Sequence, residues 1–423
     1  VRSDGNEYPY SGTDDIDSCK RGVRMKLVFI SCYMSPHQKP FCDEMYSYFE
    51  KDFAFIATNS IDRERTSMGW SSDEADYIIY AYRDRQSEKK AHDVTNNADV
   101  VIIGSAPDAY ILSRLRAGKL TFKYSERFYK SGLKVKNLLH AAAGAWLHHG
   151  RFQRYPLYML CASAYTSADA AAFHNYIGRA FKWGYFPEAK QYDVDWLMAG
   201  KLSAVPGGEG RPRISILWAG RLIGWKHPEA AIGLAASLKK KGYAFKLRMI
   251  GNGEMEAQLR GMIRDGNLTE QVEMLGAMAP GEVRAHMEKA DVYLFTSDFH
   301  EGWGAVLNEA MNSGCAVVAS HAIGAVPFLM KDGVNGLIYE NGNQKHLEKQ
   351  ACKLLDDPAY RRKIGENAYR TIAEMWNAQV AASRFVLLAK KLAAGEPAQD
   401  LFETGPCSKA EILNNGWYHA NES

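Results

Sequence analysis

The sequence predicts an α/β protein with two doubly wound parallel-sheet domains that face a common cleft. Short apolar, β-branched runs alternate with helical patterns along most of the chain, which is the order that builds a parallel sheet covered on both faces. These runs are continuously apolar, as is typical of strands buried on both sides. A chain of 423 residues also exceeds the size that one hydrophobic core usually supports, so we expect two domains.

The first domain is expected over residues 25–200. Its strands are predicted at six apolar runs, namely 25–32, 53–58, 76–82, 99–105, 119–125 and 155–163. Residues 1–24 are polar and lack an initiating Met. We therefore expect them to be a disordered or non-native leader, with Met25 as the natural start.

The best linker candidate is KLSAVPGGEGRPR, residues 201–213, which is rich in glycine, proline and charge. The second domain, 201–379, repeats the alternation of strands and helices. Its strands are predicted at 214–220, 245–251, 272–276, 291–297 and just beyond Asn312, with helices from Pro228, Glu254, Gly281 and Gly304. Two such domains joined by a hinge place a ligand in the cleft, at the carboxyl ends of both sets of strands.

Composition limits the classes of function. Hydrophobic residues make up 46% and charged residues 24% of the chain, and a net charge of +3 gives no argument for binding nucleic acid. The seven cysteines occur singly, without a CxxC pair, which suits reduced thiols of a cytoplasmic protein better than disulfides or a zinc site. No apolar run approaches the ~20 residues that a membrane helix needs.

The stretch from Arg114 to Lys136 is strongly basic and contains a single acid, Glu126. Its basic residues are Arg114, Arg116, Lys119, Lys123, Arg127, Lys130, Lys134 and Lys136. One interpretation is a solvated face of helix and loop. The other is a surface that meets a phosphorylated acceptor or the anionic lipids of the inner membrane face, where each basic residue contributes about 1 kcal/mol.

Two cations follow the first predicted strand of the second domain. The stretch AGRLIGWKHPE, 219–229, places Gly220, Arg221 and Lys226 between that strand and a helix that starts near Pro228. Together these cations are suited to hold a diphosphate, Arg221 through a bidentate fork and Lys226 as a point charge. Taken alone, they would be read as exposed loop cations.

A glycine turn follows the next predicted strand. IGNGE, 250–254, contains Gly251-Asn252-Gly253, and glycines let a backbone approach a ligand closely or adopt positive φ. The turn lacks the third glycine of a dinucleotide-binding fingerprint. Contact with a ligand and a plain strand-to-helix turn are equal alternatives here.

Two acids flank a glycine-rich helix start in EGWGAVLNE, 301–309. Gly302 and Gly304, on either side of Trp303, allow close approach, and the first amides of a helix favour phosphate. Glu309 lies five residues into a helix from Gly304, about 7–8 Å along its axis. Acids beside a phosphate site suit ligand hydroxyls, so Glu301 and Glu309 predict a ligand with phosphates and vicinal diols, such as a nucleotide sugar.

EGWGAVLNE resembles the E-x7-E signature of retaining glycosyltransferases of the GT-B fold, glycosyltransferase family 4, also called group 1. AGRL…WK, IGNGE, GCAVVAS and DGVNGLIYE resemble successive landmarks of that family. The resemblance is specific over 214–380 and architectural over 25–200, and it implies two Rossmann-like domains. It also implies that the chain needs neither a metal nor a cofactor.

The resemblance further implies roles for single residues. Arg221 and Lys226 would neutralise the leaving diphosphate, and Glu309 would hold the ribose. Glu301 would bind the donor sugar, and the amides of 302–304 would contact sugar or phosphate. The donor sugar itself stays open, because Phe328 stands where the family commonly has Glu.

The first domain departs from the family pattern. The segment from Ser35 stands where a Gly-Gly turn is common, and the family's first-domain histidine has no clear match. His37, Ser125, Glu126 and Arg127 lie at strand ends facing the predicted cleft and are our candidates for acceptor contact. For His37, a packed or solvent-facing loop histidine is an equal alternative.

The chain ends in a helical stretch, 367–392, and an irregular tail. By the resemblance, the last helix crosses back to the first domain, so we expect 380–423 to join 25–200. The alternative is a plain C-terminal helix of the second domain. DVD at 193–195 imitates a metal-binding DxD motif, and we interpret it as incidental.

We therefore expect a retaining hexosyltransferase that uses a nucleoside diphosphate sugar, with UDP favoured over GDP. It would act on a hydroxyl acceptor in bacterial polysaccharide or glycolipid biosynthesis. The alternatives are a non-catalytic nucleotide-sugar-binding partner of another transferase, or a GT-B phosphorylase or epimerase. A nicotinamide oxidoreductase is disfavoured, because no strand is followed by G-x-G-x-x-G.

Overall fold

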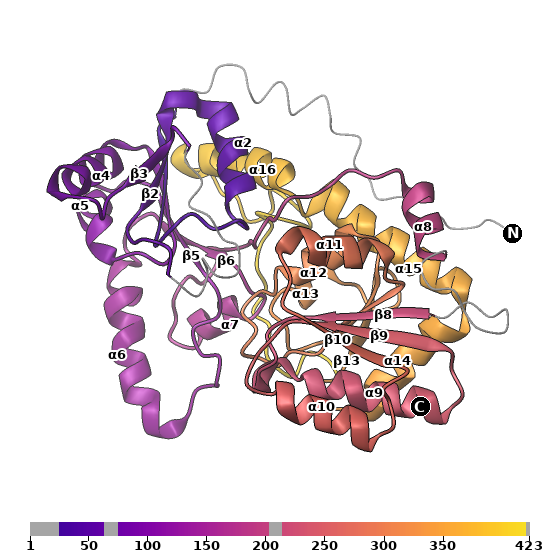
Figure 1. Cartoon of the computed structure of the whole chain (residues 1–423). Coiled ribbons are helices and arrows are strands. Elements are labelled where there is room, and N and C mark those ends of the chain that lie inside the picture. Colours follow the sequence, from indigo (N-terminus) through magenta and orange to yellow (C-terminus); the bar gives the residue numbers. More distant parts are fainter. Residues whose placement is uncertain (1–24, 63–74, 203–213, 420–423) are drawn as a thin grey trace, which may run out of the picture.

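A computed structural model describes residues 25–62, 75–202 and 214–419. Within these ranges the chain forms two parallel sheets with helices on their faces (Figure 1), which confirms the predicted fold class. The expected leader, 1–24, lies outside the described residues, as does nearly all of the expected linker. No helix in the described ranges is long and apolar enough to cross a bilayer.

The first sheet has the strand order β3-β2-β1-β4-β5-β6-β7 and is parallel throughout. Its strands are β1 (Leu27–Ser31), β2 (Phe53–Ala57), β3 (Ile78–Tyr80), β4 (Val100–Ile103), β5 (Thr121–Ser125), β6 (Leu157–Cys161) and β7 (Ala180–Lys182). The helices between them are α2 (Lys39–Phe49), α4 (Arg85–Asn97), α5 (Leu112–Arg116), α6 (Leu138–His148) and α7 (Thr166–Ala171). The six predicted apolar runs each contain a strand; β7 was not predicted, because its residues AFK do not lie in a continuous apolar run.

The second sheet has the order β10-β9-β8-β11-β12-β13, with a similar reversal of order at its first strand. Its strands are β8 (Ile214–Ala219), β9 (Phe245–Ile250), β10 (Val272–Gly276), β11 (Val292–Phe295), β12 (Ala316–Ser320) and β13 (Leu337–Tyr339). Its helices are α9 (Pro228–Lys240), α10 (Glu256–Asp265), α11 (Pro280–Lys289), α12 (Val306–Asn312), α13 (Val326–Leu329), α14 (Gln344–Asp356) and α15 (Pro358–Arg370).

The chain leaves the first domain earlier than the predicted boundary at residue 200. Helix α8 (Val194–Leu202) packs on α11 and α15 of the second domain. Its Leu197 and Met198 are buried with Tyr369, and the Nζ of Lys201 donates to the carbonyl of Ala290 at 2.7 Å, beyond the end of α11. Because α8 buries its apolar side chains on α15, it belongs with the second sheet.

The last helix, α16 (Ala378–Ala393), returns to the first sheet and packs against α2 (Figure 1). A π-helical turn, Thr371–Met375, ends the preceding helix, and Asn377 caps α16 by accepting from the amide of Val380 at 2.9 Å. The ring of Phe385 lies 6.2 Å from Phe41 and 5.0 Å from Phe122. These aromatic contacts tie the end of the chain to the core of the first domain.

Candidate functional site

Lys226 and Glu301 form an ion pair where two strands of the second sheet end. The loop after β8 carries Lys226, and the loop after β11 carries Glu301, so neighbouring parallel strands bring them to one edge. The Nζ of Lys226 lies 2.5 Å from Oε2 of Glu301, and the two side chains are only 14% and 11% exposed. Ser297 donates to the same Oε2 at 3.0 Å. Among the described residues Oε1 of Glu301 has no hydrogen-bond partner.

Both predicted cations lie near the indole ring of Trp225. The Nζ of Lys226 lies 4.8 Å from the centre of the indole ring, and Cζ of Arg221 lies 6.0 Å from it. Arg221 is exposed, whereas Lys226 is half-buried. The backbone of Lys226 is held by the hydroxyl of Thr296, which donates to its carbonyl at 2.7 Å. The loop therefore offers one fixed and one exposed cation on the same side of the site.

Glu309 lies in α12 as a half-buried acid whose carboxylate has no hydrogen bond or ion pair among the described residues. Burial raises the pKa of its carboxyl, and the positive charge of Arg284 offsets part of this effect. The buried hydroxyl of Tyr293 donates to the carbonyl of Ala219 at the end of β8. Burial, Glu309 and Glu301 together raise the pKa of Tyr293, which indicates that both acids lie around the end of β8.

The glycine turn after β9 packs on the loop after β8. A Cβ on Gly251, whose φ is +140°, would lie 1.8 Å from the carbonyl oxygen of Gly220. A Cβ on Gly253 would lie 2.4 Å from the carbonyl oxygen of Leu222. The amide of Leu222 donates to the carbonyl of Asn252 at 2.7 Å. The packing of the two loops thus requires these glycines, whatever ligand they meet, and leaves the side chain of Asn252 exposed.

The segment 302–304 lies between the two domains. Trp303 is fully buried, donates from Nε1 to Asn308 at 2.9 Å, and packs so closely on Gly184 that a Cβ there would lie 2.4 Å from the indole. Its side chain is part of the core, so only its backbone is left to contact a ligand. Gly304 adopts φ +88° beside the ring of Phe295.

Glu126 and His37 meet at Tyr185 of the first domain. The Tyr185 hydroxyl donates to Oε1 of Glu126 at 3.0 Å, and the His37 ring lies 5.8 Å from the Tyr185 ring. Glu126 reaches the second domain, because a Cβ on Gly302 would lie 1.8 Å from its Oε2. Burial lowers the pKa of His37 to about 4, so this imidazole is neutral at pH 7.

The other two acceptor candidates point elsewhere. The hydroxyl of Ser125 donates to the carbonyl of Glu126 at 2.8 Å. Arg127 is buried, pairs with Asp169 at 3.1 Å and lies 4.9 Å from the Tyr165 ring. The side chain of Arg127 therefore holds the inner structure of the first domain together, while Glu126 lies against Gly302 and His37 lies beside Tyr185.

Several basic residues of the stretch 114–136 contact internal partners, so the stretch does not form one continuous basic surface. Arg114 is buried and caps backbone carbonyls, with the shortest contact 2.6 Å to Leu120. Lys123 pairs with Asp108 at 2.6 Å, and Lys130 pairs with Glu126 at 2.7 Å. Lys134 and Lys136 remain exposed.

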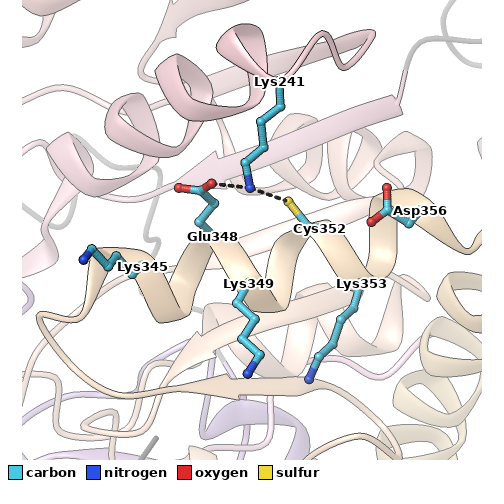
Figure 2. Close-up of a pocket in the computed structure, with 7 residues that line it drawn as sticks. All are labelled: Lys241, Lys345, Glu348, Lys349, Cys352, Lys353 and Asp356. Carbon is cyan, nitrogen blue, oxygen red and sulfur yellow. Dashed lines mark hydrogen bonds and ion pairs between the residues drawn. The ribbon is translucent and has the colours of Figure 1, made fainter. Parts of the chain in front are cut away.

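A pocket of about 420 Å³ lies away from this site, between α9 and α14 (Figure 2). Its lining consists of Lys241, Lys345, Glu348, Lys349, Cys352, Lys353 and Asp356. Lys241 follows the end of α9, and Cys352 and Asp356 lie in the last turns of α14. These positions are near the amino ends of the strands, so the pocket does not include the loops that carry Arg221 and Glu301.

Three residues of the site were not predicted from the sequence. Trp225 stands in a stretch already selected for its cations, and Ser297 stands at the end of a predicted strand, four residues before Glu301. Either could have been selected by its position. Tyr185 lies in a segment with no periodic pattern, and the sequence held no signal that it would join His37 to Glu126.

Comparison with known proteins covers the second domain more closely than the first. Residues 207–371 match the family model described as glycosyl transferases group 1. The chain is 33% identical over 139 residues to the amylovoran biosynthesis glycosyltransferase AmsK of Erwinia amylovora, covering 32% of this chain and 34% of AmsK. It is 34% identical over 137 residues to the putative colanic acid biosynthesis glycosyltransferase WcaL of Salmonella typhimurium, covering 31% of this chain and 34% of WcaL. The chain thus spans about a third of the length of these relatives.

Solved structures cover both domains at low identity. HepE (Alr3699) of Anabaena, solved in complex with UDP, superposes with a TM-score of 0.62 at 14% identity, over 88% of this chain and 100% of HepE. Sucrose-phosphate synthase of Thermosynechococcus elongatus superposes with a TM-score of 0.61 at 14% identity, over 88% of this chain and 100% of the synthase. These similarities show that the fold is GT-B.

Proposed function

We propose that this protein is a retaining glycosyltransferase of family 4 that moves a hexose from a UDP-sugar to a hydroxyl group of a saccharide or glycolipid intermediate. The observation that carries the proposal is the Lys226–Glu301 pair beside the unpartnered carboxylate of Glu309. The match of residues 207–371 to group 1 glycosyltransferases supports it, as do the names of relatives in amylovoran and colanic acid biosynthesis.

The donor would bind across the carboxyl ends of β8 and β11. Arg221 and Lys226 would hold the diphosphate, Arg221 closing on it as an exposed fork and Lys226 as a fixed charge. Glu301 has one oxygen engaged and one open to a hexose hydroxyl, because Lys226 and Ser297 share Oε2. The carboxylate of Glu309 would accept hydrogen bonds from ribose hydroxyls, which would compensate for its burial.

The reaction would proceed on one face of the sugar. The bond between the anomeric carbon and the diphosphate oxygen breaks, the acceptor oxygen forms the new bond, and the acceptor proton passes to the leaving diphosphate. Arg221 and Lys226 would stabilise the charge that develops on the diphosphate, the kind of electrostatic preorganisation that is usually the largest catalytic contribution. Because two cations supply this charge, we propose that the reaction needs no metal.

Binding of nucleotides tests the donor site before any acceptor is known. Thermal unfolding would be followed with UDP, GDP and ADP separately, and we expect stabilisation by UDP, since a ligand at 100 times its Kd adds about 2.7 kcal/mol. HepE, of the same fold, has been solved with UDP and with UDP-glucose, which makes UDP the first choice.

The matched control is Glu309→Gln, which should abolish most of the stabilisation by UDP. Stabilisation by GDP alone would change the donor class. No stabilisation by any nucleotide would contradict the proposed donor site, and the protein would then be better described as a non-catalytic partner of another transferase. Release of sugar phosphate in the presence of inorganic phosphate would instead identify a phosphorylase.

A further inference from the structure

The most exposed apolar surface of the described chain lies on and beside α6. Of the ten large apolar side chains exposed in the described residues, six fall within 133–147. Val135, Leu139 and Trp146 are 92%, 87% and 63% exposed. A soluble protein usually buries such residues or scatters them singly, so a cluster of this kind marks a contact surface.

The cluster is a stripe along one side of a helix. Leu139, Ala143 and Trp146 follow one another in α6 at spacings of four and three residues, which places them on a common face about 10 Å long. Val135 lies in the 3₁₀ turn directly before this helix. The buried residue of α6 is Ala145, on another side of the helix. In Figure 1, α6 extends away from the strands of the first sheet. The stripe therefore faces outward, and we call it the α6 stripe.

The exposed charged residues at both ends of α6 are basic, and the acid that contacts the helix, Asp108, lies 3.0 Å from Nδ1 of His148 and pairs with Lys123. From Arg127 to Ala168 the sequence contains no Asp or Glu. Helix α6 itself has no charged residue, while Lys134 and Lys136 precede it and Arg151 and Arg154 follow it, all four exposed. Lys134 and Lys136 form no ion pair or hydrogen bond with any described residue. An apolar helix face with basic residues at both ends that form no ion pair among the described residues is the pattern of a helix that lies in a membrane interface.

We propose that the α6 stripe docks on an anionic lipid surface, with Leu139 and Trp146 entering the headgroup boundary and Lys134, Lys136, Arg151 and Arg154 facing lipid phosphates. Tryptophan is enriched at this depth of a bilayer. A second copy of the chain is a poorer occupant, because a symmetric contact through this face would oppose like charges.

The docking surface adjoins the candidate site. The loop from β5 to α6 places Glu126 against Gly302, and its Ser131 hydroxyl lies 3.1 Å from Nε2 of His300 in the second domain. Docking through α6 would therefore hold the junction of the two domains near the bilayer. The lipid proposal does not rest on the proposed transfer reaction, because vesicle binding is measured without donor or acceptor.

Vesicle sedimentation tests the proposal with the full chain. One set of vesicles would contain phosphatidylcholine alone, and the other phosphatidylcholine mixed with phosphatidylglycerol. We expect binding only to the anionic vesicles, and we expect high salt to weaken it because screening reduces the contribution of the basic residues.

Two pairs of variants separate the apolar and basic contributions. Leu139→Ser with Trp146→Ser should weaken binding to anionic vesicles at least tenfold, and so should Lys134→Gln with Lys136→Gln. The matched controls are Trp196→Ser, at a tryptophan 68% exposed on α8, and Lys345→Gln with Lys349→Gln on α14. Both controls should bind like the unchanged protein, and circular dichroism would establish that every variant is folded.

Two outcomes would overturn the proposal. One is equal binding by the unchanged protein and the two α6 variants. The other is no binding of the unchanged protein to anionic vesicles. A dimer in analytical ultracentrifugation that Leu139→Ser with Trp146→Ser dissociates would then assign the α6 stripe to contact between copies of this chain.

Discussion

At the scale of single residues, the site combines a satisfied ion pair with an unsatisfied acid. Lys226 and Glu301 neutralise each other at 2.5 Å, whereas the half-buried carboxylate of Glu309 has no hydrogen bond or ion pair among the described residues. A carboxylate that loses part of its hydration without gaining a hydrogen bond costs free energy, and ligand hydroxyls would supply the missing hydrogen bonds. Perturbed acids of this kind are enriched at functional sites.

Glu309→Gln should reduce turnover of a UDP-sugar at least a hundredfold without lowering stability. Burial raises the pKa of Glu309 in the folded state, so the folded protein loses stability as the pH rises above the unfolded value of about 4.3. A neutral glutamine removes that cost, and unfolding by urea at pH 7 should show equal or greater stability. Lower stability together with normal turnover in Glu309→Gln would contradict both the predicted loss of turnover and the predicted gain or retention of stability.

Lys226→Met should also reduce turnover at least a hundredfold, because the leaving diphosphate loses its fixed cation. The measurement is kcat/KM for the UDP-sugar. The matched control, Lys240→Met at the end of α9, removes a lysine far from the ion pair and should leave kcat/KM unchanged. Addition of a chelator should change neither protein, and a loss of activity on chelation would contradict the metal-independent mechanism.

His37 should make the protein less stable in acid. Its pKa is about 4 in the folded state and about 6.5 when unfolded. Because the unfolded chain binds the proton first, stability falls as the pH drops from about 6.5 toward 4. His37→Gln should flatten this part of the pH profile of urea unfolding, whereas His140→Gln, at an exposed histidine, should not. A pH profile of stability that His37→Gln does not change would show that other groups cause the loss of stability in acid.

At the scale of elements, the site depends on contact between loops. The turn after β9 packs on the loop after β8 so closely that Gly251 has no room for a Cβ. The loop after β11 is fixed by Trp303, which is buried against Gly184. Strand ends at one edge of a parallel sheet bring these loops together, and their mutual packing then orients Arg221, Lys226 and Glu301.

Gly251→Ala should lower the free energy of unfolding by about 2 kcal/mol or more, since it adds both a clash and an unfavourable φ. Urea unfolding measures the effect. Gly224→Ala is the matched control, because a Cβ there meets nothing within 4 Å and its φ is not positive. Equal stability of the two variants would show that the loops move apart at little cost.

At the scale of the whole molecule, the tail joins the two domains at their junction. After α16 the chain reaches the second domain, where the hydroxyl of Tyr418 donates to the carbonyl of Ile338 at 2.6 Å. Trp417 donates from Nε1 to the Tyr165 hydroxyl at 2.9 Å, and His321 contacts the carbonyl of Asn415 at 3.2 Å. Tyr165 in turn donates to the carbonyl of His321 at 2.5 Å. Residues 415–418 thus contact both sides of the junction.

Trp417→Ala with Tyr418→Ala should allow the domains to separate more often, because both domains lose contacts with the tail. We expect a larger radius of gyration in small-angle X-ray scattering. Ile412→Ala, at an exposed residue of the same tail, is the matched control and should leave the radius unchanged. An unchanged radius in both variants would show that the other contacts at the junction hold the domains without the tail.

Local sequence patterns were enough to predict the two parallel sheets and to select the acids and cations of the second domain. Continuous apolar runs separated by helical patterns report burial on both faces of a sheet, and this signal is local. Arg221, Lys226, Glu301 and Glu309 were also readable, because each follows a strand or lies in the helix after it. Topology then places such residues at one edge of the sheet.

Features that depend on contacts between distant segments became visible only in the three-dimensional structure. It assigned Trp303 to the core, Arg127 to Asp169 and α8 to the second domain, and it joined His37 and Glu126 through Tyr185. It also buried Arg114, Lys123 and Arg127 of the basic stretch and left the α6 stripe exposed. None of these features follows from local pattern, because a charged or aromatic side chain has the same sequence signal whether its partner is water, ligand or a residue 100 positions away.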